Sequence, residues 1–474
     1  MVKGGFGLVF STPFFLFTYF PLVLAIHAIT PLKWRNAVLL VVNLIFYGWK
    51  KPAYILIMFA SIGIDYVHGL LVEKAKGAGN DKRAKRYVIQ SMAFNLALLG
   101  FFKYWDFIAG SLHGLGLTFM PVLGLELPIG ISFYTFQTMS YTVDVYRGDA
   151  KAQRNIVNFG TFVTLFPQLI AGPILKYKDL ADQIDERDYP IERFAAGVQI
   201  FTVGLAKKVL LANNLGSLWD YYKALPAGEL TTAGAWLGIV AFAFHLYFDF
   251  SGYSDMAVGL GQMLGFEFLG NFNYPYMAKS ITDFWRRWHI SLSSWFRDYL
   301  YIPLGGSRCS KGRLVFNLMA VWTATGIWHG ANWNFLLWGI YYGVLLVLEK
   351  LVWGKALQKL PAALQHVYAL ALVLIGWALF AIEDFSALGP YLGSMLGFAG
   401  GGLVNGTVFY HLRSYTLILL LAAVGSSPLV KSLWHKLPGK AQKLLCPLLI
   451  LAGLLLSTAY LVDGTYNPFL YFQF

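Results

Sequence analysis

The sequence predicts an all-α, polytopic integral membrane protein, and two features of its composition support this class. Of its 474 residues, 57% are hydrophobic and 13% are charged, whereas a soluble domain carries roughly 25% charged residues. Apolar runs that approach the roughly 20 residues needed to cross a bilayer recur along the chain. They include 14–29, 235–248, 335–348, 417–425 and 448–456. We therefore expect residues 1–474 to form a single integral-membrane domain.

The distribution of Lys and Arg predicts how the chain crosses the membrane. These residues give a formal net charge of +13 and concentrate in 73–86, 305–313 and 431–443. Segments 110–127 and 383–406 contain neither residue type. Because Lys and Arg are enriched in cytoplasmic loops, the first three segments are expected inside and the other two outside. This order gives about eleven or twelve crossings with both termini outside, and it explains the positive charge without a nucleic-acid partner.

Two regions, 147–193 and 265–314, do not look like simple membrane spans. The first mixes both signs of charge, and the second is rich in Trp, Arg and Gly. Irregular backbone at membrane depth is tolerated only where it is buried in protein or lines a cavity. We therefore expect interfacial helices and re-entrant pieces in both regions. The two cysteines, Cys309 and Cys446, form no CxxC motif, so the sequence predicts neither a disulfide nor a metal site.

Asp249 and Asp255 are carboxylates within or beside an apolar run. Placing such a group at the centre of a bilayer costs roughly 2.5–3.5 kcal/mol on insertion scales, so the carboxylate is expected either to pair with a positive charge or to have a function. Asp249 lies four residues before Tyr253 and shares a helix face with it. One interpretation is that the carboxylates pair with an arginine such as Arg286 or Arg297 and hold the helices together. The other is that they line a reaction cavity.

A second polar cluster lies in the stretch ITDFWRRWHISLSSWFRDYLYIPLGG. Arg286, His289, Ser293 and Arg297 recur at steps of three, four and four residues, which predicts the polar face of a continuous amphipathic helix. Such a helix could lie at the membrane interface with its arginines toward lipid head groups. Alternatively, its polar face lines a wet cavity that holds an anionic or thioester-linked ligand.

A third polar stretch, TATGIWHGANW, places His329 in a long apolar neighbourhood. An ionisable residue inside a membrane protein is a functional-site hypothesis by default. The alternative is a neutral imidazole that is hydrogen-bonded to a main-chain carbonyl. His289 lies in the other polar stretch, and this second histidine favours the functional interpretation. Gly326 and Gly330, on either side, would allow another backbone to approach closely.

Several stretches resemble the membrane-bound O-acyltransferase family, in its bacterial alginate O-acetyltransferase branch, with teichoic-acid D-alanylation proteins as more distant cousins. They are LPIGISFYTFQTMSYTVDVYRG, LIAGPI, FDFSGYSDMAVGLGQMLGF, NFNYPYMAKSITDFWRRWHISLSSWFRDYLYIPLGG, GIWHGANWNFLLWG and NPFLYFQF. The resemblance implies a bundle of about 11–12 transmembrane helices, with interfacial and re-entrant pieces, around a central cavity. In this resemblance His329 corresponds to the family's near-invariant histidine, and His289 to its second, upstream polar position.

The resemblance implies that an acetyl group passes from a cytoplasmic thioester to hydroxyls of an exported polysaccharide. Acetyl-CoA or a carrier-protein thioester would be the donor substrate, and no bound cofactor or metal is expected. An extracytoplasmic SGNH-hydrolase-like partner and a place in the bacterial cytoplasmic membrane are also implied. The aromatic tail 466–474 would dock this partner or pack back on the bundle.

The same resemblance suggests residue roles. His329 would take the hydroxyl proton as a general base or accept the acyl group itself, and the sequence leaves both routes open. His289 would be the second catalytic residue and, with the arginines, would hold the donor. The residues expected to line the donor site and cavity are Gln137, Asp249, Tyr253, Ser254, Asp255, Arg286, Arg297, Trp328 and Asn332.

Two alternative functions remain. A transporter would use Asp249, Asp255 and His329 as a proton or substrate relay. Transporters often contain internal repeats, and we see none in this sequence. A family member with a lipid or protein acceptor would keep the acyl-transfer chemistry and change only the hydroxyl that is modified.

Overall fold

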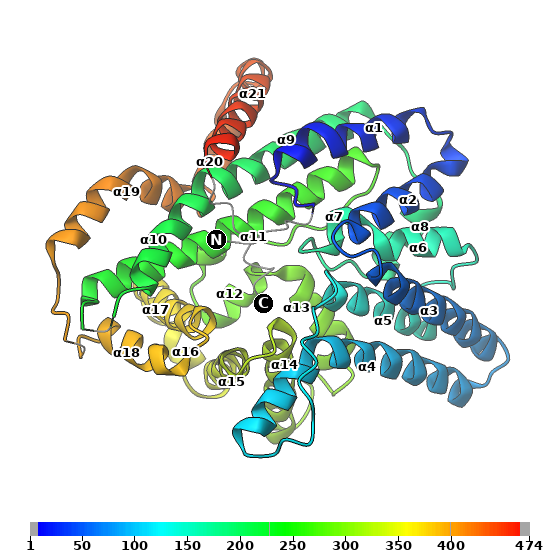
Figure 1. The fold of residues 1–474 in the computed structure, drawn as a ribbon, viewed down its shortest axis with the longest axis horizontal. Coiled ribbons are helices and arrows are strands. Elements are labelled where there is room, and N and C mark those ends of the chain that lie inside the picture. The colour runs from blue at the N-terminus through cyan, green and yellow to red at the C-terminus, as the bar shows by residue number, and fades with distance from the viewer. Residues whose placement is uncertain (1–7, 227, 399, 465–474) are drawn as a thin grey trace. The chain divides into compact units, whose positions relative to one another are not determined.

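The computed structural model describes residues 8–226, 228–398 and 400–464, and every regular element within these ranges is a helix (Figure 1). The aromatic tail 466–474, for which we expected a docking role, lies outside the described residues. The chain divides into two compact units. The first comprises Met1–Phe201 and Met256–Leu269, and the second comprises Thr202–Asp255 and Gly270–Phe474. The expectation of a single domain stays a prediction.

The first unit contains the N-terminal helices. They are η1 (Phe15–Tyr19), α1 (Phe20–Ile29), η2 (Leu32–Trp34), α2 (Arg35–Gly48), α3 (Tyr54–Gly77), α4 (Asp81–Gly114), α5 (Ile131–Arg147), α6 (Ile156–Thr164), α7 (Phe166–Leu169), α8 (Tyr177–Asp185) and most of α9 (Ile191–Ala206). Helix α5 is almost entirely buried, so α3 and α4 pack against it as part of the unit's core.

A buried polar network joins α3, α4 and α5. The carboxylate of Asp65 on α3 accepts hydrogen bonds from Ser91 Oγ at 2.5 Å and from Asn95 Nδ2 at 2.7 Å. On α5, Thr142 Oγ1 lies 3.1 Å from Ser91 Oγ, and Thr138 Oγ1 donates to Asn95 Oδ1 at 3.2 Å. Buried polar groups are tolerated when each has a partner, so this network fixes the relative rotation of the three helices.

The second unit contains the remaining helices. They are η3 (Lys207–Ala212), α10 (Asn213–Lys223), most of α11 (Thr232–Met263), η4 (Pro275–Met277), α12 (Ile281–Arg287), α13 (Ile290–Phe296), η5 (Arg297–Tyr301), α14 (Lys311–His329), α15 (Trp333–Leu348), η6 (Glu349–Trp353), α16 (Gly354–Leu357), α17 (Ala362–Ala381), α18 (Phe385–Met395), α19 (Gly406–Gly425), α20 (Leu429–Lys436) and α21 (Gly439–Asp463). Of these elements, η3, η5 and η6 are π-helical turns that continue from α-helices.

Within the described residues, seven helices are long and apolar enough to cross a membrane. They are Tyr54–Gly77, Ile191–Lys223, Thr232–Met263, Trp333–Leu357, Ala362–Ala381, Gly406–Gly425 and Gly439–Asp463. The prediction of an all-α polytopic membrane protein is therefore confirmed. Seven is fewer than the eleven or twelve expected crossings, because some apolar runs form short helices. At 1.5 Å per residue, Arg35–Gly48 measures roughly 21 Å, less than the roughly 30 Å hydrocarbon core.

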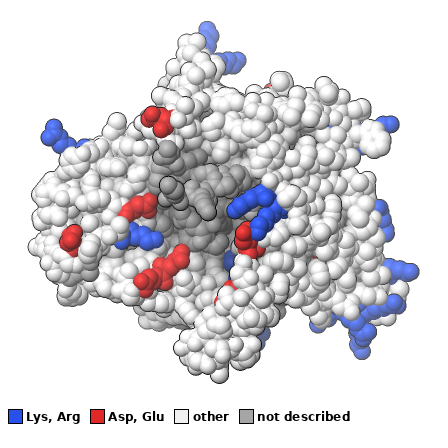
Figure 2. All heavy atoms as spheres, viewed as in Figure 1, with Lys and Arg blue, Asp and Glu red and all other residues white. Residues whose placement is uncertain are grey.

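The surface is consistent with a lipid environment. Helices α19 and α21 expose large apolar side chains, among them Leu417, Leu420 and Leu448. Figure 2 shows one face of the molecule, on which charged side chains are sparse and most of the surface is uncharged. An extensive apolar surface is costly in water and favourable against lipid, so these helices face the membrane.

Candidate functional site

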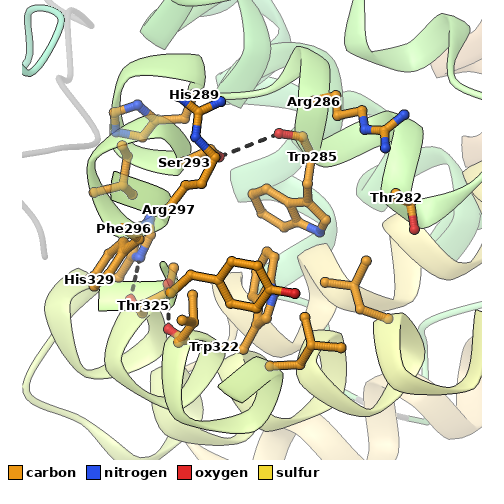
Figure 3. Close-up of a pocket in the computed structure, with 15 residues that line it drawn as sticks. Thr282, Trp285, Arg286, His289, Ser293, Phe296, Arg297, Trp322, Thr325 and His329 are labelled. Atoms are coloured by element: carbon orange, nitrogen blue, oxygen red, sulfur yellow. Dashed lines mark hydrogen bonds between the residues drawn. The ribbon is translucent and has the colours of Figure 1, made fainter. Parts of the chain in front are cut away.

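A cavity of about 250 Å³ in the second unit contains both histidines that the sequence singled out (Figure 3). Helices α12, α13 and α14 supply most of its walls. Its lining residues are Thr282, Trp285, Arg286, His289, Leu292, Ser293, Phe296, Arg297, Tyr301, Leu318, Val321, Trp322, Thr325, His329 and Leu346. In the view of Figure 3, the two imidazoles lie on one side of the cavity and Arg286 lies on the other. The cavity thus combines two imidazoles, two guanidinium groups and an aromatic wall.

His329 is the last residue of α14, and its imidazole is oriented by its own helix. Its Nδ1 lies 2.8 Å from the main-chain oxygen of Thr325. Because a carbonyl oxygen can only accept, we assign the proton to Nδ1 and the lone pair to Nε2. Aromatic rings pack on the imidazole, with Trp328, Trp338 and Phe380 at centroid distances of 5.1, 4.9 and 5.7 Å. The side chain is therefore held in one orientation and one tautomer.

Glycines bring α14 and α15 into close contact next to His329. A Cβ on Gly326 would lie 2.4 Å from the main-chain oxygen of Phe335, and one on Gly339 would lie 2.5 Å from that of Trp322. A Cβ on Gly330 would lie 2.1 Å from the Phe335 ring. These distances are far below van der Waals contact, so the glycines of the TATGIWHGANW stretch are needed for packing around the histidine.

The second histidine occupies a break between two helices. The prediction of one continuous helix through His289 is wrong: α12 ends at Arg287 and α13 begins at Ile290. His289 has a left-handed conformation with φ of +46°, which few non-glycine residues adopt. The break comes from contacts with a neighbouring loop at Asn271, which sequence periodicity does not reveal. Even so, all four polar residues of the predicted face, Arg286, His289, Ser293 and Arg297, line the cavity.

His289 is buried in aromatic surroundings. It is 1% exposed and contacts Phe250 and Trp328 at ring-centroid distances of 4.7 and 6.1 Å. The residue lies outside the seven apolar helices. Burial lowers the pKa of His289 well below its usual range, and nearby His329 lowers it further. The imidazole is therefore neutral at neutral pH, so it can accept a hydrogen bond or a proton.

The two arginines of the cavity have different environments. Arg297 Nε donates to Asp298 Oδ1 at 2.8 Å, so part of its charge is neutralised. Arg286 is exposed, and it forms no ion pair within the part of the chain that the structure describes. A guanidinium group that is not neutralised by a carboxylate can bind an anionic group of a ligand bidentately.

The carboxylates of α11 have lysine partners in place of the arginines that the sequence suggested. Asp249 lies 2.5 Å from Lys208 Nζ, and Asp255 lies 2.6 Å from Lys207 Nζ. A Cβ on Gly252 would lie 2.6 Å from the main-chain oxygen of Gly204 and 3.1 Å from the main-chain nitrogen of Lys208, so this glycine allows α11 to approach the end of α9 and the start of η3. Asp249, Asp255, Tyr253 and Ser254 are not among the lining residues of the histidine cavity. Their expected role at the donor site stays a prediction.

The remaining residues that the sequence predicted for the donor site and cavity, Trp328, Asn332 and Gln137, lie in different surroundings. Trp328 contacts both imidazole rings, although it does not line the cavity itself. Asn332 Oδ1 caps α15 by accepting from Trp333 N at 2.6 Å. Gln137 lies on α5 of the first unit, fully buried, and its amide has no hydrogen-bond partner among the described residues. The roles expected of these residues stay predictions.

Sequence reasoning missed Glu349, which fixes the start of α12. Its carboxylate accepts hydrogen bonds from Ile281 N at 2.7 Å, from Thr282 N at 2.9 Å and from Thr282 Oγ1 at 2.7 Å. Tyr368 on α17 adds a hydroxyl at 3.1 Å. Glu349, the first residue of η6, therefore joins η6 and α17 to α12, the helix that carries Trp285 and Arg286. The sequence contains a signal for Glu349, because an acidic residue directly after the apolar run 335–348 is expected to have a partner or a function.

Comparison with known proteins shows the family to which this chain is related. Residues 147–367 match the model of the MBOAT, membrane-bound O-acyltransferase, family. A probable alginate O-acetylase of Azotobacter vinelandii is 41% identical over 88% of this chain and 84% of its own length. A peptidoglycan O-acetyltransferase of Helicobacter pylori is 32% identical over 84% and 82%. A teichoic acid D-alanyltransferase of Bacillus subtilis is 29% identical over 54% and 69%.

The fold and these matches define a multi-pass membrane enzyme that transfers acyl groups to hydroxyls. The chain belongs to the membrane-bound O-acyltransferase family. The family resemblance that the sequence suggested is thus confirmed, including its closer likeness to alginate O-acetylases than to teichoic-acid D-alanylation proteins.

Proposed function

We propose that this acyltransferase moves an acetyl group from a cytoplasmic thioester to hydroxyls of an exported bacterial polysaccharide, with His329 as the reacting base. The observation that carries the proposal is the orientation of His329. Its Nδ1 donates a hydrogen bond to the Thr325 carbonyl oxygen, so the lone pair of the imidazole is on Nε2. The side chain lines the cavity in which the substrates would meet. A positioned imidazole of this kind contributes roughly 10²–10⁴-fold as a general base.

The proposed step balances without any further reactant. The oxygen of a hydroxyl, either of the polysaccharide or of the partner that passes the acetyl group on to it, attacks the thioester carbonyl carbon, a C–O bond forms and the C–S bond breaks. The hydroxyl proton passes to Nε2 of His329 and then to the departing thiolate, so the products are an acetyl ester and a free thiol. In the alternative route, Nε2 accepts the acetyl group first and passes it to the hydroxyl. Both routes require an unprotonated Nε2, and detection of acetyl-His329 would identify the second.

Arg286 and Arg297 are the proposed binding groups for the donor. Acetyl-CoA and carrier-protein thioesters both carry phosphate groups, and guanidinium groups bind phosphate with good geometry. Both arginines line the cavity, and they precede the basic segment 305–313, which we expect in the cytoplasm. The donor therefore enters from the cytoplasmic side as a substrate, and no resident cofactor is required.

The names of the relatives support a polysaccharide acceptor. Two of them are named for O-acetylation of alginate and of peptidoglycan, and both substrates are exported glycans that carry hydroxyls. We propose an acceptor of this class, a place in the bacterial cytoplasmic membrane, and an extracytoplasmic SGNH-hydrolase-like partner that completes the transfer.

The test compares two histidines with the same local bond. His329→Ala and His68→Ala each remove an imidazole whose Nδ1 lies 2.8 Å from the carbonyl four residues earlier. We expect His329→Ala to abolish acetyl ester on the exported polysaccharide, and His68→Ala to retain it, in cells that lack the native protein. Blots must show equal membrane levels.

A second measurement separates the acyltransferase from a transporter. The purified wild-type protein in detergent should release free thiol from acetyl-CoA in the presence of an oligosaccharide acceptor. Acetylation near the wild-type level in His329→Ala cells would exclude His329 as the reacting base. Transport of a solute without thiol release would favour the relay alternative.

A further inference from the structure

The break that contains His289 is paired with a neighbouring loop through main-chain hydrogen bonds. Ile290 N donates to the main-chain oxygen of Asn271 at 3.0 Å, and Asn273 N donates to that of Arg287 at 2.9 Å. The bonds lie on either side of His289 and run in opposite directions. They replace the helical bonds that a continuous helix would make at this point, so the loop determines where α12 stops.

The side chain of Asn271 adds three contacts to a single oxygen. Its Oδ1 accepts from Ser291 N at 3.1 Å and from Ser291 Oγ at 2.9 Å, and it lies 3.2 Å from His289 Nδ1. The residue is 3% exposed. A main-chain N–H can only donate, so the atom that faces Ser291 N is the oxygen of the amide and not its nitrogen. This settles the orientation of the Asn271 side chain.

The orientation of Asn271 determines the tautomer of His289. Ser291 Oγ also lies 3.4 Å from Nδ1, but it gives its proton to Asn271 Oδ1 and can only accept from the imidazole. Because Oδ1 can only accept as well, the imidazole donates from Nδ1, and its lone pair lies on Nε2. A substrate group that bonds to His289 through Nε2 must therefore be a donor, an O–H or an N–H. A phosphate oxygen is excluded there.

The backbone at His289 needs such a restraint. A left-handed conformation at a non-glycine residue costs on the order of 1–3 kcal/mol and persists only where the surroundings over-determine it. Here φ is +46° at His289, and φ is +45° at Tyr274 in the paired loop. The bonds of Asn271 to Ile290 and Ser291 after His289, and the main-chain bond of Asn273 to Arg287 before it, supply the restraint, so the strain at the site is offset locally.

We infer that Asn271 is a positioning residue that holds His289 in the Nδ1–H tautomer, so that any substrate group that bonds to its Nε2 must be an O–H or N–H donor. The inference deepens the proposed function and rests on it for the identity of the substrate. Two sources share this chemistry, a hydroxyl of the acceptor and an amide N–H of the donor's pantetheine arm. Replacement of Asn271 distinguishes them, because the KM for the acceptor changes in the first case and the KM for the acetyl donor changes in the second.

The direct test reads the tautomer by NMR. The full chain, labelled with ¹⁵N-histidine and held in detergent, should show one histidine signal that disappears in His289→Gln and that has the Nδ1–H pattern. Asn271→Leu should convert this signal to the Nε2–H form or to a mixture. Asn273→Leu is the matched control, because this asparagine is exposed and two residues away, and it should change nothing. An Nε2–H pattern in the wild type, or an unchanged pattern in Asn271→Leu, would overturn the inference.

A second test uses a variant that keeps the acceptor oxygen. Asn271→Asp preserves the bonds to Ser291 and places a carboxylate beside His289. The charge favours the imidazolium form and raises the pKa of His289. His329 is the titratable neighbour that acts on His289, and the rings of Phe250 and Trp328 carry no charge.

If turnover needs neutral His289, the acidic limb of the kcat/KM profile should move to higher pH in Asn271→Asp, because the new carboxylate favours the imidazolium form. Thiol release from acetyl-CoA is the assay, and Asn273→Asp should leave the limb in place. A shift of equal size in both variants, or in neither, would refute the positioning role. If the wild type released no thiol, the proposed function would fail, whereas the NMR pattern would still decide the role of Asn271.

Discussion

The two ion pairs on α11 differ in how far water reaches them. The side chains of Lys208 and Asp249 are 1% and 2% exposed, whereas those of Lys207 and Asp255 are 25% and 33% exposed. The Coulomb attraction within a pair grows as water is excluded, and so does the cost of leaving one charge without its partner. The two pairs therefore contribute differently to stability, although they join the same two segments.

This difference predicts unequal effects of matched substitutions. Asp249→Asn removes the carboxylate at Lys208 and should destabilise the folded protein by about 3–5 kcal/mol. Asp255→Asn should cost about 1 kcal/mol or less, because water screens the remaining lysine. Denaturation of both variants in mixed micelles measures the two values. Equal destabilisation would show that burial of the pair does not decide its contribution.

At the scale of single elements, the cavity depends on how α12 is held. This helix has seven residues, too few to be stable alone. Glu349 accepts from two main-chain N–H groups at its first turn, where the helix dipole also favours a negative charge. The segment that carries Trp285 and Arg286 is thus positioned by a residue on another helix.

Glu349→Gln should weaken donor binding more than it affects the chemical step. The amide places an NH2 group against N–H donors, and leaving such groups unsatisfied costs about 1–3 kcal/mol. We expect the KM for acetyl-CoA to rise roughly 5- to 10-fold, with a smaller change in kcat, because α12 carries Arg286. Tyr368→Phe removes one bond to the same carboxylate and should have little effect. Unchanged KM in a stable Glu349→Gln protein would contradict this role.

At the scale of the whole molecule, the seven apolar helices and the basic loops between them determine how the chain sits in the membrane. Helices α19 and α21 bury only 11% and 6% of their apolar windows within the structure, so lipid must cover the rest. The basic segment 305–313 joins η5 to α14 beside the cavity. If the segment 305–313 lies in the cytoplasm, the donor reaches Arg286 and Arg297 from the cytoplasm, and if it lies outside, the donor reaches them from outside.

The native cysteines can test this orientation. Cys309 lies in the basic segment, and Cys446 lies on the apolar helix α21. In a Cys446→Ser protein, a membrane-impermeant maleimide should label Cys309 only after the membrane is permeabilised. The matched Cys309→Ser protein reports the background from α21. Labelling of Cys309 in intact cells would place the segment, and the donor entrance, outside.

The sequence by itself determined the class and family of the protein. Hydropathy, sparse charge and basic loops are local properties, and they identified an all-α membrane protein. The quoted stretches identified the family. The spacing of Arg286, His289, Ser293 and Arg297 also selected four residues that line one cavity, although the continuous helix that it predicted is interrupted at His289.

Only the tertiary structure decided the partners of these residues. The lysines that pair with Asp249 and Asp255 come from η3 and not from the arginine-rich stretch. The break at His289 is imposed by Asn271, and the start of α12 is held by Glu349. Each of these contacts joins segments far apart in the chain. Periodicity describes how a segment relates to itself, so it carries no information about which distant donor or acceptor will face it.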